Sequence, residues 1–115
     1  MWPWVLHLCV SLVIGSGSAT HNLEAFYSSR DAPDAPPADW VTDFTEWVHD
    51  KIEAGCVEDL VRYRTLAPHA VDNHPTEEHF LPLFIALGAG NGEKGRRVHA
   101  SYRNGVLAMD TYEFG

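Results

Sequence analysis

The chain has 115 residues, of which 45% are hydrophobic and 11% aromatic, and its formal net charge at pH 7 is −8. This length fits one compact domain or part of a larger one, and the composition excludes a disordered chain. The negative charge argues against a nucleic-acid-binding protein, because phosphate binding needs clusters of Lys and Arg. The basic residues that do gather in the sequence are interpreted as a solvated turn: Lys94, Arg96, Arg97 and Arg103.

The N-terminal residues resemble a signal peptide, with an apolar stretch from Val5 to Ile14 and then the small residues Gly17-Ser18-Ala19. The first Lys or Arg is Arg30, so the positively charged start of a signal peptide is missing. The stretch is also shorter than the ~20 apolar residues of a membrane span. Cys9 and Cys56 lie in no disulfide or zinc pattern, which favours reduced thiols. We predict a cytoplasmic protein without a membrane span, with a small secreted acidic protein as the alternative.

The run from Leu8 to Ile14 is continuously apolar and predicts a buried strand that ends at the turn Gly15-Ser16-Gly17-Ser18. A dinucleotide-binding fingerprint would have a third glycine where Thr20 stands, and an acidic residue on a second strand. We therefore reject nucleotide binding. A strand followed by a turn instead places His21 and Asn22 at the C-terminal edge of a sheet, where α/β proteins usually build their sites.

Three helices are predicted after a surface loop from Ser28 to Ala38, which is rich in Pro, Asp and Ala. The first covers Asp39 to Ala54, because its apolar residues recur at helical spacing and Gly55 provides a C-terminal stop. A second, shorter helix covers Val57 to Leu66, and a third covers Glu77 to Leu87. The three helices would pack on a partial sheet, which makes the fold class α/β.

The C-terminal segment, from Arg97 to Phe114, predicts a β-hairpin. Asn104-Gly105 lies between two runs rich in β-forming residues, which is the strongest short-range signal for a hairpin with a type I′ turn. The chain is therefore expected to end in paired strands.

The stretch from His74 to Gly90 is the most informative for function, because it sets two imidazoles and two carboxylates before an apolar helix. Thr76 is expected to cap the first turn of this helix, and the run from Phe80 to Leu87 is expected to be buried. His79 would then be held on a rigid element, as a metal ligand requires. Among the seven histidines, we select His79 and His21 as the candidate metal ligands.

The other five histidines are given other interpretations. His7, His49 and His99 lack polar neighbours in the sequence and are interpreted as structural or exposed. His69 and His74 flank the turn before the third helix. They are expected to be exposed to solvent, and the alternative is that they donate hydrogen bonds to the ligands of a site.

Several segments resemble the C-terminal half of the DODA-type extradiol aromatic ring-opening dioxygenases, also called the class III, protocatechuate 4,5-dioxygenase β-subunit-like group. These segments are VIGSGSATHNL at 13–23, APHA at 67–70, HPTEEHFLPL at 74–83, ALGA at 86–89 and GVLAMDTYEFG at 105–115. The resemblance implies a single truncated domain over residues 1–115, equivalent to half of a larger α/β domain. Residues 1–12 depart from the family pattern, and we expect an internal start, a frameshift or a truncated gene model.

The resemblance also implies chemistry. Family members hold a non-haem Fe(II), or Zn(II) in some cases, and open catechols such as 4,5-dihydroxyphenylalanine with O₂. It implies that His79 is a metal ligand and that His21 is a second ligand or the catalytic acid/base. A neutral imidazole at His21 can take a proton from a catechol and return it, and Asn22 can contact the substrate or fix the tautomer of His21. Glu78 is a candidate to orient the His79 imidazole, although an exposed carboxylate at a helix start is commoner.

Two ligands of the family normally come from the N-terminal half, which this chain lacks. The resemblance therefore implies a complementing N-terminal half, or a homo-oligomer, as the partner. The alternative function is a non-catalytic remnant or an interaction protein that pairs with another chain.

Overall fold

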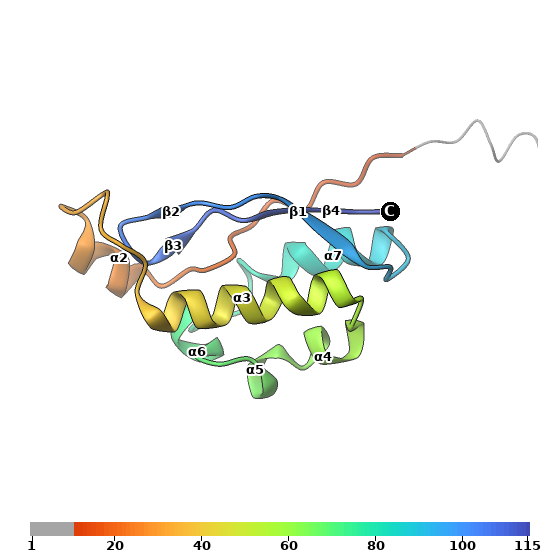
Figure 1. Ribbon diagram of the computed structural model, residues 1–115, viewed down its shortest axis with the longest axis horizontal. Helices are drawn as coiled ribbons and strands as arrows, with labels where there is room; N and C mark the ends of the chain where they lie inside the picture. Colours follow the sequence, from red (N-terminus) through yellow and green to blue (C-terminus); the bar gives the residue numbers. More distant parts are fainter. Residues whose placement is uncertain (1–10) are drawn as a thin grey trace, which may run out of the picture.

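The computed structural model describes residues 11–115, which form a small α/β structure with six helices and two antiparallel two-stranded sheets (Figure 1). The helices are α2 (Leu23–Ser29), α3 (Asp39–Ala54), α4 (Val57–Val61), α5 (Tyr63–Leu66), α6 (Ala70–Asn73) and α7 (Leu81–Ala89). The strands are β1 (Gly95–His99), β2 (Tyr102–Arg103), β3 (Leu107–Ala108) and β4 (Thr111–Phe114). The α/β class predicted from the sequence is confirmed, with two of the three expected helices shorter than predicted. None of the helices in residues 11–115 is long and apolar enough to cross a membrane.

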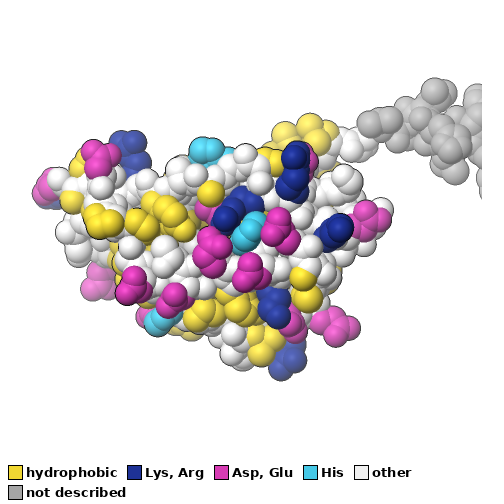
Figure 2. Space-filling model, viewed as in Figure 1, with side chains coloured by type: hydrophobic (Ala, Val, Ile, Leu, Met, Phe, Trp, Pro, Cys, Tyr) yellow, Lys and Arg dark blue, Asp and Glu magenta, His cyan; other side chains and the backbone are white. Residues whose placement is uncertain are grey.

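Helix α3 lies at the centre of the fold, between the strands and the short helices α4, α5 and α6 (Figure 1). Its bounds are those predicted from the sequence. Gly55 ends it with a φ of 69°, a left-handed conformation that costs glycine little, and donates its backbone N–H to Ile52 O. The buried residues of α3 share one face: Val41, Phe44, Thr45, Val48 and Ile52. Acidic side chains of the opposite face cross the front of the molecule in Figure 2.

The main hydrophobic core joins α3 to α4–α7 and to the end of β4. Its centre is aromatic. The Phe80 ring lies 4.7 Å from the Tyr63 ring and 5.6 Å from the Phe44 ring, measured between centroids. A smaller cluster, formed by Val41, Val106 and Ala108, packs the other end of α3 against β3.

The four strands form one long hairpin, because β1 pairs with β4 and β2 pairs with β3 inside it. At the turn, Asn104 and Gly105 have φ values of 56° and 69°, and Val106 N donates to Arg103 O. Positive φ at both central residues is the signature of a type I′ turn, so the predicted hairpin is confirmed. The loop before α3 is anchored to this turn, since Ala38 N donates to Gly105 O over 2.9 Å.

The third predicted helix begins later than expected. Helix α7 starts at Leu81 rather than Glu77, and Pro82 occupies its first turn. Proline has no backbone N–H, so a helix tolerates it in the first turn but not further along. Pro82 therefore fixes the start of α7. Thr76 therefore caps no helix. His79 lies in the turn before α7 and not on the helix itself.

The predicted buried strand is wrong for the residues that are described. Residues 11–17 have no regular secondary structure, and Leu12 and Ile14 are 86% and 77% exposed. A strand of this composition is buried only when neighbours cover it, and within residues 11–115 no strand pairs with this segment. The first part of the predicted strand, together with His7 and Cys9, lies outside the described residues.

The remaining differences concern short helices. The second predicted helix is interrupted at Arg62, which separates α4 from α5. Helix α2 was not predicted, although Asn22 supplies its N-cap, and it takes Ser28 and Ser29 from the predicted loop. Helix α6 was not predicted either. It follows His69, whose left-handed φ of 54° ends the preceding turn.

Candidate functional site

The structure brings His21 and His79 together. Their imidazole rings are stacked, with centroids 3.6 Å apart and an interplanar angle of 17°. His21 follows the segment of residues 11–20, and His79 belongs to the turn before α7. The His79 side chain is 44% exposed, so the pair is open to solvent at its edge.

Short backbone contacts hold the two histidines in place. Ser18 N donates to His79 O and His21 N donates to Asn73 O, both over 2.8 Å. The first contact requires glycine at residue 17, because a Cβ there would lie 2.3 Å from His79 O. The glycine-rich turn therefore allows the close backbone approach that brings the rings together.

His74 lies beside this pair and is fully buried, so the predicted exposure is wrong. Its Nε2 donates to Ala19 O over 2.7 Å, which ties it to the segment before His21. The pKa of His74 is lowered to about 4, mainly by burial and also by the nearby His21, while the hydrogen bond to Ala19 opposes the change. The imidazole is therefore neutral at pH 7. Its ring packs against Phe80, with 4.6 Å between centroids.

Both ends of the Asn22 side-chain amide make hydrogen bonds that hold the fold together. Its Oδ1 accepts from Ala25 N over 3.0 Å and caps α2, and its Nδ2 donates to Asp72 O over 2.7 Å. The first bond fixes the start of α2, and the second ties that start to α6. The sequence prediction had assigned this residue to substrate or to the tautomer of His21.

Glu78 is too far away to orient the His79 ring by a direct hydrogen bond, because its Oε1 lies 3.9 Å from His79 Nε2. The same oxygen accepts from Thr76 Oγ1 over 2.8 Å. Hydrogen bonds from the backbone N–H of Glu78 and from Thr76 lower the pKa of this carboxyl. The carboxylate thus places a negative charge near an exposed imidazole.

Comparison with known proteins places this chain in a family. The family described as "Catalytic LigB subunit of aromatic ring-opening dioxygenase" matches residues 9–114. The chain belongs to the LigB family. It is similar to the 4,5-DOPA dioxygenase extradiol of Mirabilis jalapa, with 38% identity over 107 residues. The corresponding protein of Beta vulgaris is 36% identical over 104 residues, and that of Escherichia coli is 35% identical over 108.

These matches cover 90% of this LigB-family chain but only 37–38% of the relatives. The chain therefore spans little more than a third of the length of the curated relatives. The family resemblance inferred from the sequence is confirmed.

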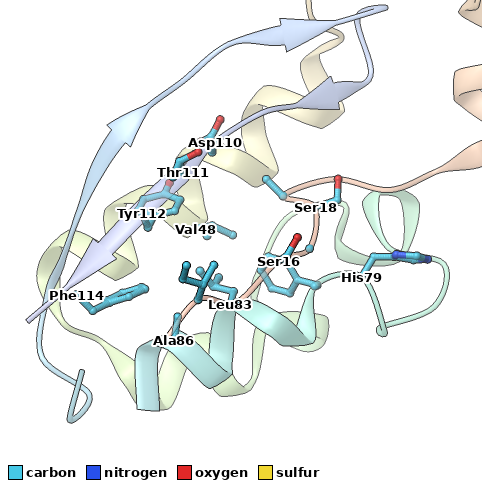
Figure 3. A pocket seen from close by; sticks show the side chains of 15 residues that line it. Ser16, Ser18, Val48, His79, Leu83, Ala86, Asp110, Thr111, Tyr112 and Phe114 are labelled. Atoms are coloured by element: carbon cyan, nitrogen blue, oxygen red, sulfur yellow. Dashed lines mark hydrogen bonds between the residues drawn. The ribbon is translucent and has the colours of Figure 1, made fainter. Parts of the chain in front are cut away.

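A cavity of about 300 Å³ lies on another side of the glycine-rich turn, between residues 14–19, α7 and β4 (Figure 3). Most of its wall is apolar. His79 reaches this wall, but its ring points away from the other labelled side chains in Figure 3. The His79 imidazole of this LigB-family chain is therefore not aimed into this cavity.

One end of that cavity is polar, because Asp110 lines it. The side chain of Asp110 is 1% exposed, and its Oδ2 accepts from Arg97 Nη1 over 3.2 Å. Burial raises the pKa of Asp110, although the Arg97 guanidinium opposes the change. Arg97 also donates to Glu46 and is only 20% exposed, so its interpretation as part of a solvated turn is wrong.

Among residues 11–115, one group of three metal-ligating side chains lies close enough to hold an ion: Glu46, His49 and Asp50. It lies on α3 and includes neither His21 nor His79. Glu46 is paired with Arg97, and His49 Nε2 lies 3.0 Å from Glu53. The sequence analysis did not single out this group, because its members follow simple helical spacing on an acidic face.

Proposed function

We propose that this chain carries part of the active site of a metal-dependent extradiol dioxygenase, which opens a catechol ring such as that of 4,5-DOPA with O₂. The observation that carries this proposal is the stacked pair of His21 and His79, whose rings come from segments far apart in the sequence. The LigB family match and the names of the relatives support the reaction class. We treat residues 1–115 as part of a single domain of this kind.

The residues present fit a non-haem Fe(II) or Zn(II) in part. Imidazole nitrogen is a ligand that both metals accept, and two such side chains lie next to each other here. The described residues add no carboxylate or third imidazole to this pair within ligating distance of both rings. Further ligands would then come from outside the described residues. When bound, the metal would supply Lewis acidity and pass charge between catechol and O₂.

In this proposal His79 is a metal ligand, and His21 is either a second ligand or the acid/base that holds the catechol proton. The backbone contacts of Ser18 and Asn73 keep both rings in place before any ligand arrives. Asn22 would contact the substrate only if one of its two structural hydrogen bonds were exchanged. We place the reaction in the cytoplasm, in agreement with the free thiol of Cys56.

The test is to add Fe(II) anaerobically to the full chain, alone and with the rest of a family domain, and then to supply a catechol and O₂. We expect a yellow ring-opened semialdehyde in the complemented sample. His79→Ala should reduce the bound iron, whereas His99→Ala should not, because His99 is an exposed histidine whose Nε2 is hydrogen-bonded to Ser101 Oγ. Stoichiometric iron without product in any sample would exclude catalysis by this polypeptide. Unchanged iron in His79→Ala would reject the ligand assignment.

One observation favours the second candidate function, an interaction protein without catalysis. Large apolar side chains remain exposed beside the glycine-rich turn, including Leu12, Ile14 and Ile85. Exposed apolar surface of this kind marks a binding face. The same experiment separates the two functions, since an interaction protein forms a complex but gives no product.

A further inference from the structure

Thr20, the residue before His21, is a polar residue that is almost completely buried. Its exposed fraction is 1%, and it lies where the segment leading into α2 runs beside β3 (Figure 1). A buried hydroxyl is costly unless it is hydrogen-bonded, so its partners show which parts of the fold it joins.

The Thr20 hydroxyl makes two hydrogen bonds to the hairpin. Its Oγ1 donates to Val106 O over 2.8 Å and accepts from Ala108 N over 2.9 Å. Val106 and Ala108 are 8% and 1% exposed, so water has little access to either backbone group. The hydroxyl therefore pairs with this edge of the hairpin in the way that the backbone of a neighbouring strand would.

The backbone on either side of Thr20 is held by the end of α6. His74 Nε2 donates to Ala19 O over 2.7 Å, and His21 N donates to Asn73 O over 2.8 Å. In the described part of the chain, no other hydrogen bond than those of Thr20 joins the segment before α2 to the hairpin. The His21 backbone thus lies between two anchors, and Thr20 supplies the one on the hairpin side.

We propose that Thr20 is a positioning residue for the histidine pair: its hydroxyl fixes the backbone of His21 so that the His21 ring lies against His79. The ring centroids are only 3.6 Å apart, so a small shift of the His21 backbone separates them. Groups that act in catalysis must be held to within a fraction of an ångström. The inference rests on the proposed function for the catalytic use of the pair, but its geometry stands without it.

Removing the hydroxyl separates this role from that of the side-chain volume. Valine has nearly the shape of threonine but no hydroxyl, so Thr20→Val leaves Val106 O and Ala108 N without their partner. The segment must then move away from the hairpin to admit water, and His21 moves with it. Thr20→Ser keeps both hydrogen bonds and should keep His21 in place.

The test is NMR on the full chain without metal, which records nuclear Overhauser contacts between the ring protons of His21 and His79. These contacts should be present in the wild type and in Thr20→Ser and lost in Thr20→Val. The matched control is Thr45→Val, which removes another buried hydroxyl, bonded to Val41 O and not to the segment before α2. This control should keep the contacts.

Turnover gives a second measurement. In the sample complemented with the rest of a family domain, Thr20→Val should lower kcat for the catechol by about tenfold or more, with a smaller change in KM, because a misplaced reactive group slows the chemical step. Thr20→Ser should restore most of the rate.

Three NMR outcomes would overturn the proposal. They are ring contacts that persist in Thr20→Val, an equal loss in Thr45→Val, and a loss in Thr20→Ser, which would assign the effect to the methyl group. Rapid hydrogen exchange of the Ala108 amide in the wild type would also overturn it, without any variant that might misfold. Because the NMR test needs neither metal nor product, correct positioning without ring opening would contradict the proposed function alone.

Discussion

The two sides of the molecule use apolar residues differently. Between α3, the short helices and the hairpin, Phe44, Phe80 and Leu60 are at most 2% exposed. Before the glycine-rich turn and on the outer side of α7, residues of the same chemical kind, such as Ile14 and Ile85, are more than 60% exposed. An apolar sequence pattern therefore indicates that a residue favours burial. Whether it is buried depends on the neighbours that the fold packs against it.

The largest expected effect tests this contrast directly. Phe44→Ala removes a fully buried ring that contacts Tyr63, His74 and Phe80, and should cost about 4 kcal/mol of unfolding free energy. Ile85→Ala removes an exposed side chain and should change stability by less than about 0.5 kcal/mol. Urea denaturation of both variants measures the difference. Equal losses would mean that the outer side of α7 is already covered in the isolated chain.

Acid should destabilise the well-packed side of the molecule, between α3, the short helices and the hairpin, because this side contains the buried His74. The pKa of His74 is about 4 in the folded chain and 6.5 in the reference state, so between these values the unfolded chain binds more protons. The contribution of the neutral His74 to the free energy of unfolding is then fully present above pH 6.5. It falls by about 3 kcal/mol as the pH drops to 4. His74→Gln should flatten this pH dependence and His99→Gln should leave it unchanged. A wild-type slope retained in His74→Gln would assign the effect to other groups.

The smallest expected effect concerns the start of α2, where Asn22 is the N-cap. Asn22→Ala removes the cap of α2 and should cost about 1 kcal/mol. Asn22→Asp keeps the accepting oxygen and loses only the hydrogen bond to Asp72 O, so most of that stability should remain. Thermal denaturation compares the two variants. A loss of catechol binding in the complemented sample, with stability unchanged, would instead favour the substrate role.

The sequence predicted α3 and the hairpin well because their signals are local. The bounds of α3 follow from helical spacing and from Gly55, and the hairpin follows from Asn104-Gly105, whose positive φ values the structure confirms. Each of these signals works through backbone geometry within a few residues. No distant partner was needed to interpret them.

The failures have a common cause, which is dependence on distant contacts. Residues 11–14 have the composition of a buried strand, but burial requires neighbouring strands that the described part of the chain does not contain. His74 was predicted to be exposed beside a turn, but its ring packs against Phe44 and Phe80. The nearness of His21 and His79 was expected from family resemblance, since nothing in their spacing measures a ring-to-ring distance. Their roles as ligands remain predictions.

The absence of a Cβ at Gly17, which is inherent to glycine, has a consequence for protein engineering. Since even one extra carbon there would collide with the carbonyl of His79, a mutational scan should report this position as intolerant although it bears no reactive group. A substitution at residue 17 can thus separate the two histidine rings without altering either imidazole. In related sequences, an alanine at this turn would indicate that the two imidazoles no longer stack.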